Sequence, residues 1–163
     1  MVRYTEREHP SGFTYIAPTA YFAPGDIIAE LGDVPASAQD PRRLQLSRDH
    51  FILPPQIAHA CEPAAYIDWS TLTLRALKPI EADDETPSPD SKPKISYHFA
   101  TSERDGYPAF ECLCGSLACI GVFSGYADMT RESLARLEEY YERYARFLPE
   151  RPKDFFSSYV RAG

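Results

Sequence analysis

Four cysteines are the residues of this chain best suited to chemistry, and their number and spacing indicate a metal site. Three form the run Cys112-x-Cys114-x4-Cys119, and Cys61 lies far upstream. Zn²⁺ prefers thiolate ligands, and a structural zinc site is closed by four of them. A redox role fits less well, because Cys112 and Cys114 have C-x-C rather than C-x-x-C spacing. The cysteines therefore predict a zinc ion that would hold a distant loop against the C-terminal cysteine module.

Two further segments carry motifs that form a recognisable pattern together with the cysteines. The segment Ala58-His-Ala-Cys-Glu-Pro-Ala64 surrounds the upstream cysteine, and Ile95-Ser-Tyr97 lies between it and the C-terminal run. This combination resembles the SET and post-SET domains of lysine methyltransferases, with their N-H-S-C-x-P-N segment, catalytic tyrosine and C-x-C-x4-C run. Pro24-Gly-Asp-Ile-Ile28 is similar to the x-G-E-x-I hairpin that opens the SET fold. The resemblance spans roughly residues 12 to 127.

The resemblance implies an activity and a set of site residues. The implied activity is S-adenosylmethionine-dependent N-methylation of a lysine or another amine, with Tyr97 as the catalytic residue and a structural zinc on the four cysteines. Ile95 stands where the family uses Phe or Tyr to narrow the lysine channel, so an aliphatic residue there implies more room near the amine. The residues implied to contact the cofactor are Tyr15, Ala58, His59, Phe110 and Leu113.

The implied reaction places a clear demand on the site. Methyl transfer from a sulfonium to an amine is an in-line displacement, so the amine must arrive uncharged and aligned with the methyl carbon. An ordinary lysine has a pKa of ~10.4, and a dry channel would lower that pKa. The resemblance implies that this channel is a narrow tunnel of aromatic rings and carbonyls, with the hydroxyl of Tyr97 pointing at the reacting centre.

The cofactor side departs from the family pattern. Ala58 and Ala64 replace the two asparagines of the motif, Ala60 replaces its serine, and Phe13 and Tyr15 stand at the positions of the G-x-G glycines. Each Asn-to-Ala change removes a hydrogen bond worth about 1 kcal/mol in a buried site. We therefore expect weak cofactor binding, carried by main-chain groups and apolar side chains.

This departure leaves two alternatives beside the methyltransferase. One is a repurposed SET scaffold that catalyses a different reaction on a small molecule, as a biosynthetic tailoring enzyme would. The other is a non-catalytic binding module. Tight binding of S-adenosylmethionine would separate the methyltransferase from both.

Composition and charge bear on partners and location. Hydrophobic residues make up 44% of the 163-residue chain and aromatic residues 13%, enough for one domain with its own core. The chain has 17 basic against 24 acidic residues and a net charge of −7, so we expect no nucleic-acid binding. A cationic substrate, such as a lysine-bearing peptide or protein or a small-molecule amine, is compatible with that charge. We expect no membrane span and no signal peptide, hence a cytoplasmic or nuclear location in which thiols stay reduced.

The elements that must position these residues are predicted to be mainly β. Short apolar runs bounded by turn residues indicate strands over 13–17, 27–31 and 50–53, and a hairpin over 65–77. The polar, proline-rich stretch 86–94 indicates an exposed loop. With the resemblance, this implies a SET-like core over 1–109 built from small sheets and a pseudoknot, then a post-SET zinc module over 110–127.

The remaining segment, 128–163, is predicted to hold a helix and a tail. Leu134, Leu137, Tyr141, Tyr144 and Leu148 recur at helical spacing between a capping Asp128 or Thr130 and Pro149. The helix is interpreted either as a strut packed on the domain or, with the additional aromatic residues Tyr140 and Phe147, as a homodimer seam. The apolar tail 155–160 is expected to dock on the protein.

Overall fold

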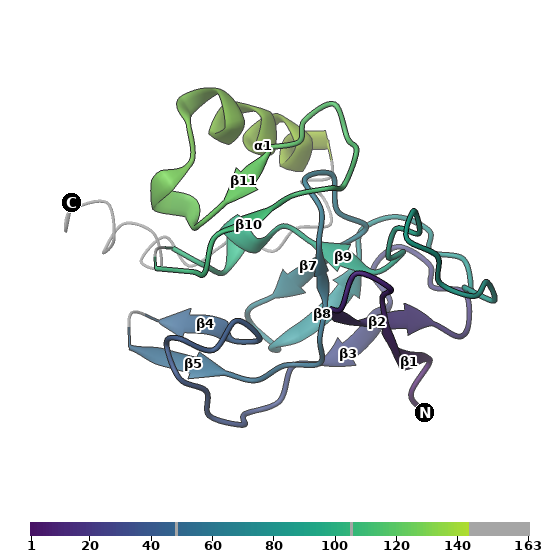
Figure 1. Ribbon diagram of the computed structural model, residues 1–163. Helices are drawn as coiled ribbons and strands as arrows, with labels where there is room; N and C mark the ends of the chain where they lie inside the picture. Colours follow the sequence, from purple (N-terminus) through teal and green to yellow (C-terminus); the bar gives the residue numbers. More distant parts are fainter. Residues whose placement is uncertain (48, 105, 144–163) are drawn as a thin grey trace.

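The structure is a computed structural model that describes residues 1–47, 49–104 and 106–143. Within these residues the chain forms several small β-sheets, two short 3-10 helices and one α-helix (Figure 1). This arrangement confirms the predicted mainly β class with a C-terminal helix. No helix in the described part of the chain combines the length and apolarity that a membrane crossing requires.

The first half of the chain builds two hairpins and a three-stranded sheet. The N-terminal hairpin pairs β1 (Tyr4–Glu8) with β2 (Thr14–Pro18), and a second hairpin pairs β4 (Leu44–Ser47) with β5 (His50–Ile52). The three-stranded sheet is antiparallel in the order β3-β8-β7, with bounds Ile27–Glu30, Thr73–Ala76 and Ala65–Asp68. These elements enclose most of the core.

The second half joins segments that are distant in sequence. The two-residue strand β6 (Ala58–His59) pairs in parallel with β9 (Ser96–Tyr97), so that His59 lies opposite Tyr97. The 3-10 helix η1 (Phe99–Thr101) follows β9 directly. The strands β10 (Phe110–Glu111) and β11 (Val122–Phe123) pair around the cysteine run, and η2 (Tyr126–Asp128) leads into α1 (Arg131–Arg143).

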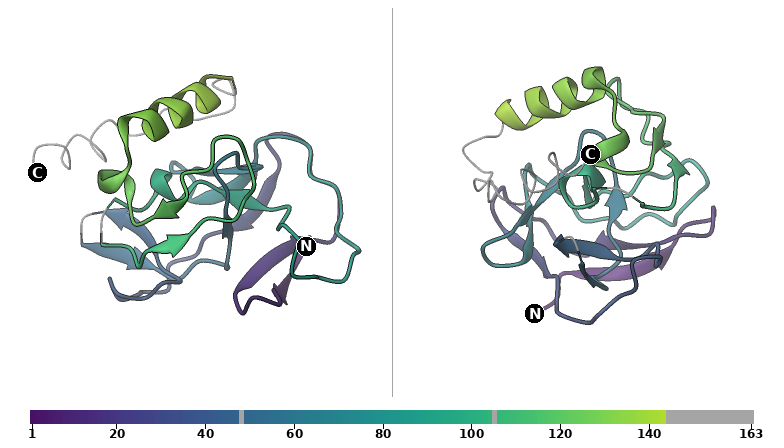
Figure 2. Two further views of the ribbon diagram at one scale, coloured as in Figure 1. Left: turned by 45° about the horizontal axis from the view of Figure 1, so that its top comes forward. Right: turned by 90° about the vertical axis from the view of Figure 1, so that its left-hand side faces the viewer.

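Two apolar clusters hold these parts together. The larger one fills the space between the sheets and includes fully buried Ile16, Leu44, Leu74 and Ile95. The smaller one joins Ala100, Tyr107, Phe123 and Leu137. Phe99 packs against both clusters, so η1 connects the sheets to the cysteine segment and the helix. Figure 2 shows α1 and the N-terminal hairpin on opposite sides of the molecule.

Most of the strands predicted from periodicity are observed. The predicted strands over 13–17, 27–31 and 50–53 correspond to β2, β3 and β5, and the predicted hairpin over 65–77 is β7–β8. The stretch 86–94 is a largely exposed loop, as predicted. The prediction did not include β1, β4 or the two-residue strands. The two-residue strands are too short to show a period of two. The domain division at residues 109 and 127 stays a prediction.

The helix begins where the sequence indicates. The Ser133 amide donates to Thr130 Oγ1 at 3.1 Å, which makes Thr130 the N-cap. Leu137 and Tyr140 are buried, and the Tyr140 hydroxyl donates to the Pro63 carbonyl. This part of the helix therefore packs on its own domain. Tyr144, Phe147, Leu148, Pro149 and the tail lie outside the described residues, and the homodimer seam stays a prediction.

Candidate functional site

The four cysteines meet between two loops. Cys61 follows β6, whereas the other three lie in the loop between β10 and β11. That loop is closed by a 2.6 Å hydrogen bond from the Cys112 amide to the Gly121 carbonyl and by a turn from the Cys119 amide to the Ser116 carbonyl. Ligand atoms of all four cysteines lie within 4.8 Å of one another. The structure thus brings together the four cysteines that the sequence singled out.

The spacing of the sulfur atoms fits a shared metal ion. The Sγ atoms of Cys61 and Cys112 are 3.7 Å apart. Two thiolates bound to one tetrahedral zinc, with Zn–S bonds of about 2.3 Å, would be about 3.8 Å apart. A disulfide would require about 2.0 Å. The cysteine cluster can therefore hold a metal ion at this separation without rearrangement of the Cys61–Cys112 pair.

The electrostatics of the cluster favour thiolate formation at one cysteine first. A hydrogen bond from the Cys61 thiol lowers the pKa of Cys112 well below its ordinary value, burial opposes this shift, and His59 adds to it. The same hydrogen bond, together with burial, raises the pKa of Cys61. These opposite shifts favour the thiolate at Cys112 over the thiolate at Cys61. A cation at the centre would displace the remaining thiol protons, because thiols ligate metals as thiolates.

A second possible ligand set, His59, Cys61 and His98, also has its ligand atoms within 4.8 Å. In both histidines, however, Nδ1 accepts a backbone N–H at 3.1 Å, from Phe99 in one case and Ala100 in the other. A neutral imidazole has only one acceptor nitrogen, so each Nε2 carries the ring proton. Burial, together with His59, lowers the pKa of His98 well below its ordinary value, which keeps that ring neutral. These hydrogen bonds favour the four-cysteine set.

Tyr97 is buried beside the cysteine segment. The β6–β9 pairing places it opposite His59, two residues before Cys61. Its hydroxyl lies 3.0 Å from Ser102 Oγ, and its ring centroid is 4.9 Å from that of Phe99. Ile95, two residues earlier, is fully buried in the larger apolar cluster. The structure thus places the predicted catalytic and channel residues on one short segment.

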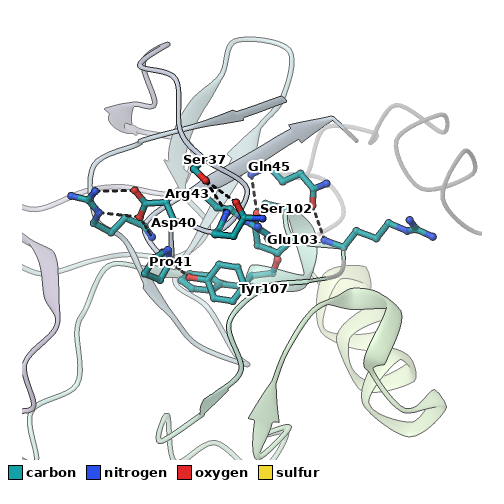
Figure 3. A network of polar contacts seen from close by, with 12 residues as sticks. Ser37, Asp40, Pro41, Arg43, Gln45, Ser102, Glu103 and Tyr107 are labelled. Atoms are coloured by element: carbon teal, nitrogen blue, oxygen red, sulfur yellow. Dashed lines mark hydrogen bonds and ion pairs between the residues drawn. The ribbon is translucent and has the colours of Figure 1, made fainter. Parts of the chain in front are cut away.

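A buried ion pair joins Arg43 to Glu103, next to Ser102 (Figure 3). The Glu103 carboxylate accepts hydrogen bonds from Arg43 Nε at 3.0 Å and from the backbone N–H of Gln45 at 2.9 Å. It also accepts one from the Ser102 side chain. The Glu103 side chain is 0% exposed and that of Arg43 2%. Burial raises the pKa of Glu103, while these hydrogen bonds oppose the shift.

Ser102 connects this ion pair to Tyr97. Its Oγ donates to the Phe99 carbonyl at 3.3 Å and lies 3.0 Å from the Tyr97 hydroxyl. Sequence reasoning did not find this network, because Arg43 and Glu103 are 60 positions apart and neither lies in a motif.

Aromatic rings surround His59. The ring centroids of Phe99, Phe110 and Phe123 lie 5.2, 5.7 and 5.6 Å from that of His59, with Phe123 stacked. Phe110 and His59, both predicted cofactor contacts, thus lie together. Ala58 is half-buried in β6.

The other two predicted cofactor contacts lie elsewhere. Leu113 is 73% exposed and so does not pack with Phe110 into an enclosed wall. Tyr15 is buried in the N-terminal hairpin, where its ring packs with those of His9 and Phe13.

Comparison with known proteins adds one similarity. The chain is 30% identical over 80 residues to the methyltransferase flvH of Aspergillus flavus, an alignment that covers 48% of this chain and 40% of that protein. The chain thus spans less than half the length of this curated relative. No protein-family model matches the chain.

Proposed function

We propose that this protein is a SET-type N-methyltransferase that uses S-adenosylmethionine to methylate a lysine or another amine. The observation that carries the proposal is the parallel pairing of β6 with β9, which places Tyr97 beside the loop of the four-cysteine cluster. The similarity to a methyltransferase supports the same class of reaction. A SET-like fold, in which the pairing of these distant segments is part of a pseudoknot, belongs to this proposal.

The metal in this proposal is a structural zinc ion. Cys61, Cys112, Cys114 and Cys119 would hold it with no open position, so its chemistry is to tie the β6 loop to the β10–β11 loop. Each thiolate ligand comes from a loop rather than a regular element. The zinc would therefore order the walls of the site without contacting substrate.

The substrate side is formed by Tyr97 and Ile95. The Tyr97 hydroxyl, held 3.0 Å from Ser102 Oγ, would face the methyl group carried on a cationic sulfur. Burial around Ile95 supplies the low-dielectric surroundings that favour a neutral amine. The net charge of −7 favours approach of a cationic substrate, either a lysine-bearing peptide or protein or a small-molecule amine.

The cofactor would contact the main chain of Ala58 and His59 and the ring of Phe110, and Leu113 and Tyr15 are proposed as further cofactor contacts. The location proposed for the protein is cytoplasmic or nuclear, with neither nucleic acid nor membrane as a partner. The homodimer through α1 is a further, separate proposal.

Calorimetry with S-adenosylmethionine and with S-adenosylhomocysteine tests the function. We expect both to bind, more weakly than in family members that have the motif asparagines, and we expect zinc chelation to abolish the heat. Tyr97→Phe should keep cofactor binding and lose transfer of a labelled methyl group to amine acceptors. Tyr107→Phe is the matched control, because Tyr107 is also buried and its hydroxyl donates to the Pro41 carbonyl.

A repurposed scaffold acting on a small molecule is the second candidate. The observation that favours it is the exposure of Leu113 together with the alanines at both asparagine positions. Absence of heat at millimolar cofactor would refute the methyltransferase and favour this candidate. A non-catalytic binding module would bind neither cofactor and turn over no substrate.

A further inference from the structure

The imidazole of His59 lies between the cysteine cluster and the segment that carries Tyr97. On one side, His59 Nδ1 accepts the Phe99 amide hydrogen at 3.1 Å. On the other side, His59 Nε2 is 3.4 Å from the Cys61 Sγ. Since Nδ1 acts as the acceptor, the ring proton is on Nε2, and the contact with sulfur is an N–H···S hydrogen bond.

His59 Nε2 is not the sole donor to the Cys61 sulfur. The Ile120 amide gives Cys61 Sγ a second donor at 3.4 Å. Four thiolates around one divalent cation carry an excess of negative charge, and such N–H donors offset part of it. His59 is the side-chain donor in this set.

Packing holds the imidazole in this orientation. The ring of Phe123 stacks on it at an interplanar angle of 24°, and the rings of Phe99 and Phe110 meet it edge-on. The backbone of His59 is paired with that of Tyr97 in the β6–β9 ladder. Rotation of the ring would break both of its hydrogen bonds at once.

The acceptor side of His59 leads directly to the hydroxyl of Tyr97. Phe99, whose amide binds Nδ1, begins η1, and the Ser102 amide closes that turn on the Phe99 carbonyl at 3.0 Å. The Ser102 side chain in turn is hydrogen-bonded to the Tyr97 hydroxyl at 3.0 Å. A displacement of the imidazole would therefore shift η1 and the hydroxyl that orients Tyr97.

We propose that His59 is a positioning residue that couples metal binding at the four cysteines to the placement of Tyr97, through an Nε2–H···S bond on one side and the Phe99 N–H···Nδ1 bond on the other. This inference rests on the proposed metal site. A metal bound to the four thiolates holds the Cys61 sulfur in place, and this sulfur orients the His59 ring through the Nε2–H···S bond. The ring in turn holds the start of η1 through the Phe99 amide. Loss of the metal frees the sulfur atoms and loosens the same chain of contacts.

The first test is a zinc competition against a chromophoric chelator, with His59→Phe compared with wild type. The substitution keeps an aromatic ring for the packing and removes both nitrogens. Loss of an outer hydrogen bond to a metal ligand typically weakens metal binding by about 10–100-fold, and we expect a change in that range. His9→Phe is the control, since His9 also accepts an amide hydrogen at Nδ1 and stacks on the ring of Phe13, but lies in the N-terminal hairpin.

The second test is nitrogen NMR of the wild-type protein, which does not depend on how a variant folds. We expect His59 as the neutral Nε2–H tautomer, and we expect zinc removal to shift the amide signal of Phe99 while leaving that of Ser11 unchanged. An Nδ1–H tautomer, an unshifted Phe99 amide, or zinc affinity of His59→Phe within twofold of wild type would each overturn the coupling. Failure of the wild type to bind zinc would instead overturn the metal site itself, and with it the coupling.

Discussion

Cysteine-to-serine substitution at Cys61 should cost far more metal-linked stability than the same substitution at Cys114. Cys61 and Cys112 are 51 positions apart, so a metal held by both acts as a cross-link that closes a long loop. With the loop-entropy relation used for disulfides, a loop of that length contributes about 4 kcal/mol to the free energy of unfolding at 25 °C. Cys61→Ser removes this cross-link completely.

Cys114→Ser removes one ligand from the same site but leaves the long loop closed by Cys61, Cys112 and Cys119. We therefore expect Cys114→Ser to retain most of the contribution of about 4 kcal/mol that was calculated for the cross-link in the wild type. Comparing the two variants separates the cross-link from the loss of a ligand, because each loses one thiolate.

The assay is urea unfolding followed by circular dichroism, with excess buffered zinc and again with a chelator. The difference between the two free energies of unfolding is the metal-linked stability, and it cancels the cost of placing serine at a buried position. Elemental analysis should find one zinc per wild-type chain. Equal metal-linked stability in the two variants, or a wild type equally stable with and without zinc, would refute the reasoning.

Three further predictions concern the interior around Tyr97. Arg43→Met should lower the free energy of unfolding in urea by about 3–5 kcal/mol, because it leaves the buried Glu103 carboxylate without its cationic partner. Adding Glu103→Leu should restore most of this loss. A cost of under about 1 kcal/mol for Arg43→Met alone contradicts the prediction. Ser102→Ala should lower turnover without changing the cofactor Kd, while Ser102→Thr keeps the hydroxyl and the rate; equal rates for both argue against the Tyr97–Ser102 bond. Ile95→Tyr should restrict the product to lower methylation states by mass spectrometry, and an unchanged product distribution removes Ile95 from the channel.

Several features of this protein follow from its sequence alone. The four cysteines and their spacing were sufficient to predict one cluster, because thiolates are the ligands that zinc prefers and the chain has four of them. The helix start at Thr130 and the hairpin over 65–77 were equally accessible, since capping and strand periodicity depend on neighbours within a few residues.

Other features depend on contacts between distant residues, and only the tertiary structure decided them. The pairing of His59 with Tyr97 joins two-residue strands that are too short for any periodicity. The burial of Arg43 against Glu103 and the tautomer of His59 follow from which groups lie within hydrogen-bonding distance. A residue's type states what it can donate or accept, but its partner is set by the packing of the whole chain.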